Sequence, residues 1–143
     1  MTLKVKYHNK NLLPLEFIQN KSDWIDLRSA ETVTIKAFEF KIISLGVSIQ
    51  LPKGYEAYIV PRSSTFSTWG IIQTNSVGII DESYCGDNDV WKMPVLALRD
   101  TTINENDRIC QFRIQPKMPG INFEAIKTLK NKDRDGFGST GKN

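Results

Sequence analysis

The sequence predicts an all-β domain, either a sandwich or a barrel, with one short helix. Short segments that alternate apolar and polar residues, or that are rich in β-branched residues, run through the chain. Turn signals separate them at intervals of roughly 8–12 residues, which is typical of such folds. The length of 143 residues suits one domain, and 40% hydrophobic with 24% charged residues is ordinary for a globular protein.

The first half of the chain contains the predicted amino-terminal strands. Alternation around Leu3, Val5 and Tyr7 indicates a half-buried strand with the single histidine, His8, at its solvent-facing end. Further strands are expected at 33–35, at 40–51 with a bulge at Gly46, and at 55–60 after a turn at 52–54.

The second half contains the predicted helix and the remaining strands. Residues 63–74 begin with hydroxyl residues that can cap a helix, and we expect one or two helical turns there. The remaining strands are expected at 77–80, 90–98, 107–114 and 121–126. Residues 131–143 contain one hydrophobic side chain, Phe137, which is too little apolar surface to order the segment. We therefore expect a single domain over 1–126 and a mobile C-terminal arm over 127–143.

Composition excludes several classes of protein. No apolar run approaches the 18 residues of a transmembrane helix, and the first residues lack the continuous apolar stretch of a signal peptide. A cytoplasmic location is therefore expected, with no membrane partner. Cys85 and Cys110 are too few for a disulfide framework and are expected to be reduced thiols. The net charge of +3 lies wholly in 127–143, unlike the broad basic face of a nucleic-acid binder.

Three short segments can carry chemistry. The first is the tail, 134–141, where glycines, hydroxyls and Arg134 can grip a phosphate or can form an uninvolved terminus. The second is 61–65, where an arginine precedes three hydroxyl residues that can bind an anion or cap the helix. In the third, 75–84, Asp81 ends an apolar strand and can serve as a general base or cap a turn.

These segments together resemble the five motifs of the trimeric deoxyuridine triphosphatase (dUTPase) family, in order and in spacing. The similar segments are Ser22 to Ala30, Pro61 to Ser64, Asn75 to Gly86, Asp107 to Gln111, and Arg134 with Gly136 to Gly141. The resemblance covers 22–141. It implies a jelly-roll-like distorted β-barrel that forms a homotrimer with shared active sites. It also implies hydrolysis of dUTP to dUMP and pyrophosphate, with Mg²⁺ carried on the triphosphate, which limits uracil in DNA and supplies dUMP.

The resemblance implies a role for individual residues. Asp81 would position the attacking water and contact the 3′-hydroxyl, and Tyr84 would exclude a 2′-hydroxyl. Asp26 would orient waters around Mg²⁺. Uracil would be read by the hairpin from Val77 to about Asp89. The full implied substrate set is Asn75, Gly78, Ile80, Tyr84 and Phe137 for uracil and deoxyribose, and Arg62, Ser63, Ser64, Gln111, Arg134, Ser139 and Thr140 for the phosphates.

The chain departs from the family pattern at three places. Ser83 stands where the third motif usually has a second acid, and Asp23-Trp24-Ile25 replaces the usual Ala-Gly-Tyr of the first. In the fifth motif the usual arginine position holds Lys132, with Arg134 two residues closer to the glycines.

Three other functions remain open at this point. A dCTP deaminase or a bifunctional deaminase–diphosphatase shares the fold, but it needs a further acid or base that the sequence does not place. A dUTPase-like protein can act as a nucleotide-sensing binder of other proteins, although 143 residues leave little room for insertions. A carbohydrate-binding or nucleic-acid-binding β-sandwich with accidental motifs is the third.

Overall fold

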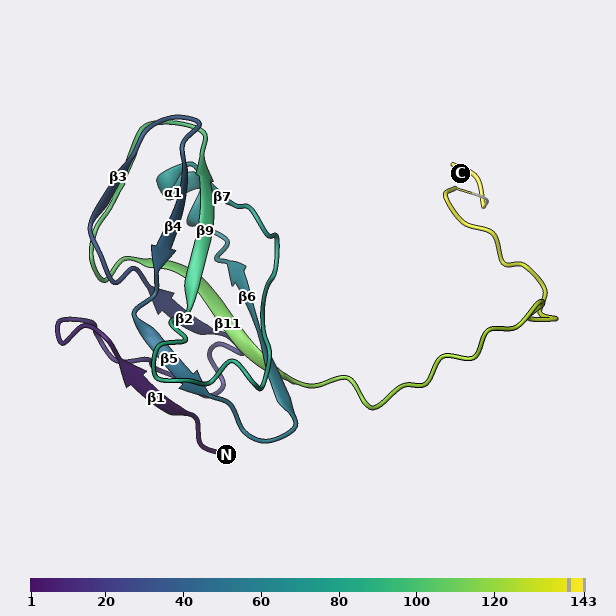
Figure 1. The fold of residues 1–143 in the computed structure, drawn as a ribbon. Coiled ribbons are helices and arrows are strands. Elements are labelled where there is room, and N and C mark those ends of the chain that lie inside the picture. The colour runs from purple at the N-terminus through teal and green to yellow at the C-terminus, as the bar shows by residue number, and fades with distance from the viewer. Residues whose placement is uncertain (139, 143) are drawn as a thin grey trace.

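The computed structural model describes residues 1–138 and 140–142, and its ordered part is built almost wholly from antiparallel strands (Figure 1). One helix, α1 (Thr65–Trp69), lies among them. The strands are β1 (Lys4–Tyr7), β2 (Ile25–Arg28), β3 (Val33–Ile35), β4 (Phe40–Ser44), β5 (Val47–Gln50), β6 (Tyr55–Pro61), β7 (Ile71–Gln73), β8 (Gly78–Ile80), β9 (Lys92–Ala97), β10 (Thr101–Ile103) and β11 (Arg108–Pro116). The predicted all-β class with one short helix is confirmed.

The strands form four sheets. The largest has the order β2-β11-β6-β8, a second has the order β4-β9-β7, and two pairs join β1 with β5 and β3 with β10. The sheets surround a common interior, but their hydrogen-bonded ladders do not join into one closed barrel over the described residues.

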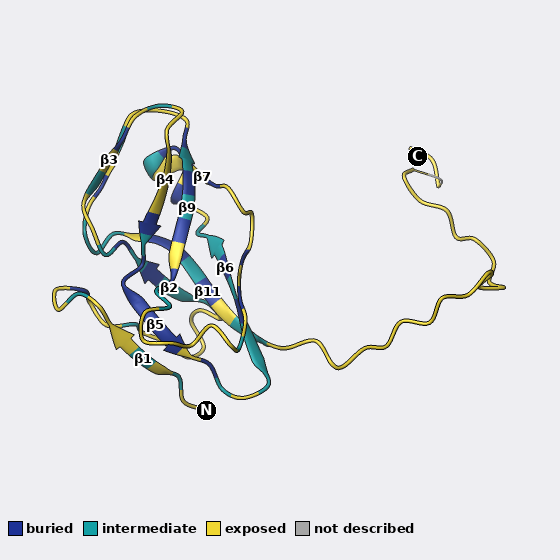
Figure 2. Cartoon of the chain, in the orientation of Figure 1, coloured by how far each residue is buried: buried dark blue, intermediate teal, exposed yellow. Residues whose placement is uncertain are grey.

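The core is built from residues of all four sheets, and Figure 2 shows buried stretches in dark blue, for example on β5 and β9. Trp91 and Phe112 are fully buried at its centre, and their rings meet edge to face with centroids 5.1 Å apart. Strands β9 and β5 contribute Met93, Val95 and Ile49 around them. This packing holds β6, β8 and β9, the strands from which the candidate site is built.

Glycine residues end two of the predicted elements early. The strand expected over 40–51 is two strands, β4 and β5, because Gly46 between them has a φ of 67°. A Cβ atom at Gly46 would lie 2.7 Å from the Cβ of Ala30, so a larger residue does not fit there. The helix expected within 63–74 stops at Gly70, which takes a left-handed conformation, and the chain continues as β7.

The strand predicted over 121–126 is absent. Beyond β11 the chain runs away from the body as an extended segment (Figure 1), and residues 117–138 are exposed to solvent. Phe123 is 95% exposed. A strand needs a neighbouring strand to pair its backbone groups, and this chain places none beside the segment. No helix among the described residues is both long and apolar enough to cross a membrane.

Strands β2 and β10 were not predicted. The short segment Ile25–Arg28 alternates apolar residues with Asp26 and Arg28, and it forms a strand because it pairs with β11. Similarly, Thr101–Ile103 pairs with β3 and lacks the length that a sequence pattern requires. In both strands the tertiary pairing decides the structure.

Candidate functional site

One pocket brings together all the residues expected to bind uracil and deoxyribose in the body of the protein. The pocket has a volume of about 240 Å³ and lies where β8 ends beside β6 and β9. It is lined by the expected residues Asn75, Gly78, Ile80, Asp81 and Tyr84, together with Ile59, Ile79, Val90, Trp91 and Lys92.

A glycine lies in the floor of this pocket. Gly78 is buried in β8 opposite Ile59 of β6, and a Cβ atom there would lie only 3.1 Å from the Ile59 Cβ. A side chain at 78 would therefore require Ile59 to shift by a few tenths of an ångström, and it would also lie 3.6 Å from the Asn75 amide nitrogen in the same pocket.

Gln73 is a residue of the site that the sequence did not indicate. Its side chain is almost fully buried, and its Nε2 donates to the Ile59 carbonyl at 2.9 Å and to Asn75 Oδ1 at 3.0 Å. Because the Asn75 oxygen accepts this bond, the Asn75 amide nitrogen is left to donate elsewhere. The sequence signal that could have indicated Gln73 is its polar side chain at the end of the apolar strand Ile71–Gln73.

The turn after β8 places Tyr84 at the rim of the pocket. The Tyr84 N–H donates to the Asp81 carbonyl at 3.0 Å, and its hydroxyl donates to the Val90 carbonyl at 3.3 Å. The ring is 38% exposed, so its face is available to a ligand. Asp81 is exposed, and its carboxylate has no hydrogen-bond partner among the described residues.

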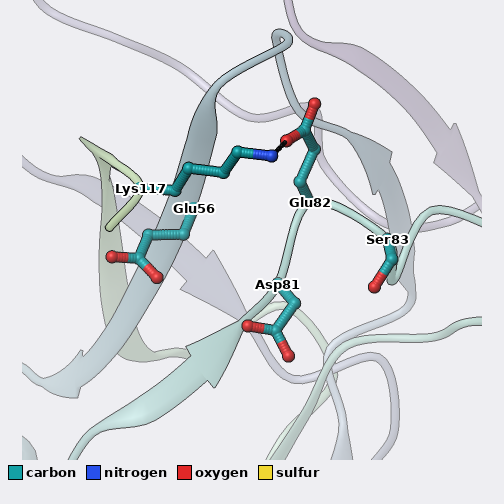
Figure 3. Close-up of a pocket in the computed structure, with 5 residues that line it drawn as sticks. All are labelled: Glu56, Asp81, Glu82, Ser83 and Lys117. Atoms are coloured by element: carbon teal, nitrogen blue, oxygen red, sulfur yellow. Dashed lines mark hydrogen bonds and ion pairs between the residues drawn. The ribbon is translucent and has the colours of Figure 1, made fainter. Parts of the chain in front are cut away.

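A second cavity, of about 470 Å³, adjoins Asp81 on its other side and is lined by Glu56, Asp81, Glu82, Ser83 and Lys117 (Figure 3). Glu82 accepts bonds from the Lys117 ammonium group and from the Gly54 N–H. These two bonds lower the pKa of the Glu82 carboxyl below its ordinary value. The Glu56 carboxylate accepts the Tyr58 hydroxyl at 2.7 Å, which raises the pKa of Tyr58.

A charged cluster stands at the opposite end of β6. Asp26 of β2 pairs with Arg62 at 2.9 Å and with Arg108 at 3.3 Å, so each of its carboxylate oxygens faces a guanidinium group. Arg62 also donates to the Arg108 carbonyl at 3.2 Å. The sequence motifs indicated Asp26 and Arg62, but the contribution of Arg108 was missed. Burial and the charge of Asp26 strongly raise the pKa of the neighbouring Cys110 thiol, which stays protonated.

Of the three hydroxyl residues after Arg62, one is bonded within the fold and two are available to a ligand. Thr65 is buried, and its hydroxyl accepts from the Arg62 N–H at 2.8 Å and donates to the Ile109 carbonyl at 2.9 Å. Ser64 stands at the start of α1 without a side-chain capping bond. Ser63 is exposed. Gln111 faces the same region and donates to the Pro61 carbonyl at 3.2 Å.

A metal ion carried on a ligand would meet Asp26, the carboxylate of the charged cluster. No group of three or more His, Cys, Asp or Glu side chains is placed to hold a metal within 1–138 and 140–142. Both oxygens of Asp26 face arginines, so a water molecule between Asp26 and an ion would leave both pairs intact. The ligand's own oxygens would have to supply most of the coordination.

The two parts of the site lie apart in one chain. Asp81 follows Ile80, which pairs with Ala57, whereas Gln111 pairs with Val60 and Arg62 follows the end of β6. Asp81 therefore stands opposite Glu56, which is four residues from Val60 and six from Arg62. At about 3.3 Å per residue, these separations are roughly 13 Å and 20 Å along an extended strand. A single phosphate group cannot contact Asp81 and Arg62 of the same chain.

The tail residues lie away from both parts. Arg134, Phe137 and Thr140 are exposed, and the Phe137 ring has no packing partner among the described residues. Lys132 is exposed as well, so the structure does not distinguish it from Arg134 as a phosphate ligand. Ser139 lies outside the described residues.

Comparison with known proteins gives consistent matches. The family model described as dUTPase matches residues 20–141. The SPbeta prophage-derived deoxyuridine 5′-triphosphate nucleotidohydrolase YosS of Bacillus subtilis strain 168 is 55% identical over 141 residues, 99% of each chain. The dUTPase of Staphylococcus bacteriophage 80alpha, solved with dUpNHpp, has a TM-score of 0.81 at 22% identity and 98% coverage of each chain. A mutant dUTPase of phage phi11 of S. aureus, solved to show how a structural Mg(II) ion is coordinated, has a TM-score of 0.77 at 20% identity, covering 92% of this chain and 100% of the other.

Proposed function

This chain belongs to the dUTPase family and hydrolyses dUTP, and from that premise we propose how its residues perform the reaction. Water attacks the α-phosphate, and the products are dUMP and pyrophosphate. The observation that carries the proposal is the pocket at the end of β8, where the expected uridine-binding residues meet beside Asp81.

Asp81 acts as the general base in this proposal. It stands at the rim of the pocket, and its carboxylate has no partner among the described residues, so it is free to accept a proton from water. Uracil enters the pocket beside Gly78, where no side chain occupies the space, and the Asn75 amide is oriented by Gln73 to donate to it. Tyr84 lies against the deoxyribose.

Arg62, Ser63, Ser64 and Gln111 bind phosphate oxygens. Cleavage of a triphosphate requires that its charge be neutralised and that the line of attack be fixed. Arg62 supplies a guanidinium group held in place by Asp26, and the serine hydroxyls add donors. Mg²⁺ bound to the triphosphate would neutralise further charge, with Asp26 orienting its water molecules.

The complete site requires more than one copy of the chain. Because Asp81 stands opposite Glu56 and Arg62 lies six residues further along the chain, roughly 20 Å away, the phosphate ligands for one Asp81 come from another protomer. We propose a homotrimer with three such shared sites. In a closed symmetric trimer, every protomer supplies Asp81 to one site and phosphate ligands to another.

An apolar face on the β4-β9-β7 sheet supports this assembly. The strand register places Phe40, Leu96 and Ile72 in one row and Ile42 with Pro94 in the next. Phe40, Ile42 and Ile72 are 45–56% exposed, although an antiparallel sheet usually presents polar residues to solvent. The face adjoins the uridine pocket, which Lys92 of β9 also lines, so a protomer packed there lies next to the site.

The C-terminal arm completes the site. Arg134, Ser139 and Thr140 hold the outer phosphates, and Phe137 stacks on uracil. The exposed Phe137 ring and the lack of packing along 117–138 leave the segment free to cover a neighbouring pocket. Closure of such an arm excludes bulk water from the reaction.

A panel of nucleotides with separate detection of pyrophosphate and ammonia tests the proposal. We expect pyrophosphate from dUTP in preference to dCTP, dTTP and UTP. Release of ammonia from dCTP would instead identify a deaminase of the same fold, and binding of dUTP without products would identify a nucleotide-sensing protein.

Replacing Tyr84 with alanine is expected to raise the relative rate for UTP. The Tyr84 ring stands at the rim of the pocket. In this proposal it leaves no room for a 2′-hydroxyl. The kcat/KM values for UTP and dUTP should approach each other in the variant. If the unsubstituted protein already hydrolyses both nucleotides equally well, the steric role of Tyr84 is wrong.

A further inference from the structure

The position of Asp81 is not fixed by bonds to its own side chain. Asp81 is exposed, it follows the last residue of β8, and its carboxylate has no hydrogen-bond partner in the described part of the chain. The main chain of 81–83 therefore sets where the Cα and Cβ atoms that carry this carboxylate lie. A general base needs a fixed position, since small displacements of a reacting group slow a reaction strongly.

The adjacent residue, Glu82, holds that stretch of main chain. Its Oε1 accepts from the Gly54 N–H at 3.1 Å, and its Oε2 accepts from the Lys117 ammonium group. The Lys117 N–H in turn donates to the Gly54 carbonyl at 2.9 Å. Three segments are thus closed into a ring: the turn between β5 and β6, the segment carrying Asp81, and the start of the C-terminal arm.

The ring also arranges charge around the cavity beside Asp81. Figure 3 shows the Lys117–Glu82 pair spanning this cavity, with Asp81 below it and Glu56 nearby. Three of the five lining residues are carboxylates, and Lys117 is the lysine among them. Ser83, which stands where the family pattern has its second acid, carries no charge. The carboxylate that bonds residues 81–83 to the neighbouring segments is that of Glu82.

We propose that Glu82 and Lys117 are positioning residues for Asp81, and that their pair fixes the catalytic segment against the β5–β6 turn and the start of the arm. The proposal rests on the assignment of Asp81 as general base. It predicts that breaking the pair slows the chemical step and leaves substrate binding unchanged, because neither side chain lines the uridine pocket.

The test compares Glu82→Gln and Lys117→Met with Lys117→Arg. The glutamine amide at position 82 can still accept from the Gly54 N–H but lacks the negative charge of glutamate. Methionine at position 117 is similar in length to lysine but has no donor for Glu82. We expect kcat for dUTP to fall by about 10- to 100-fold in both variants, with KM nearly unchanged. The arginine variant should keep most of the activity. The melting temperature should not change, since exposed ion pairs add little stability.

A matched control removes the charge of an exposed lysine outside the site. Lys10 is exposed and lines neither of the two cavities beside Asp81, so Lys10→Met should leave kcat, KM and melting temperature unchanged. The proposal is overturned if the Glu82 and Lys117 variants keep full kcat, if the loss appears in KM, or if it comes with a lower melting temperature. Activity of the unsubstituted protein on dUTP, measured in the same assay, tests the proposed function separately.

Discussion

Replacing Asp81 with asparagine is expected to lower kcat for dUTP by about 10²–10⁴-fold or more, while nucleotide binding stays nearly unchanged. The amide keeps the shape of the side chain but cannot accept a proton from water. Because the Asp81 carboxylate has no hydrogen-bond partner among the described residues, the substitution breaks no internal bond. Steady-state kinetics and calorimetric titration with a non-hydrolysable dUTP analogue measure the two effects.

Glu31→Gln is the matched control for this variant. Glu31 is an exposed carboxylate away from the pocket, so the control removes the same charge without touching the site. Its kcat should equal that of the unsubstituted protein. Near-normal turnover of Asp81→Asn would remove Asp81 from the role of general base.

Deleting residues 131–143 is expected to remove most of the activity and to leave the fold intact. The described residues of this segment are exposed, and their hydrogen bonds join only near neighbours, such as the Gly141 N–H and the Gly138 carbonyl. The core, centred on Trp91 and Phe112, therefore loses no contact. We expect the segment to contribute to activity in the ligand-bound state, where Phe137 and Arg134 cover the nucleotide.

Melting curves with and without nucleotide check this expectation. Without nucleotide the full and shortened chains should melt at the same temperature. With the dUTP analogue the full chain should be stabilised more, since at a given ligand concentration a tighter ligand stabilises the folded state more, with the logarithm of the ratio of concentration to Kd. A lower melting temperature of the shortened chain without ligand would show that the segment supports the fold.

The sequence allowed several candidate site residues to be grouped because their signals are local. The strand leading to Asp81, the turn with Tyr84 and the glycine at 78 are all contained in one short stretch, and the structure places them in one pocket. Likewise, Arg62 follows the strand predicted over 55–60, whose end is evident from the sequence pattern. Order and spacing were sufficient for these residues.

Features that depend on strand pairing were not predicted. Asp26 meets Arg108 because β2 lies beside β11, and Gln73 at the end of β7 reaches the Ile59 carbonyl of β6. Neither neighbour follows from the separate segments. The predicted strand over 121–126 failed for the same reason, since a strand pattern is not sufficient when the chain supplies no partner.

The most direct test of the shared site mixes two inactive proteins, the Asp81→Asn variant and the chain lacking 131–143. After joint unfolding and refolding, each mixed trimer contains one site with an intact Asp81 and an arm from a different protomer. Random assembly at equal amounts should restore about a quarter of the activity of the unsubstituted protein, given closed cyclic symmetry. No recovery, with mixed trimers confirmed by mass, would contradict the proposal that Asp81 and the arm of one site come from different chains.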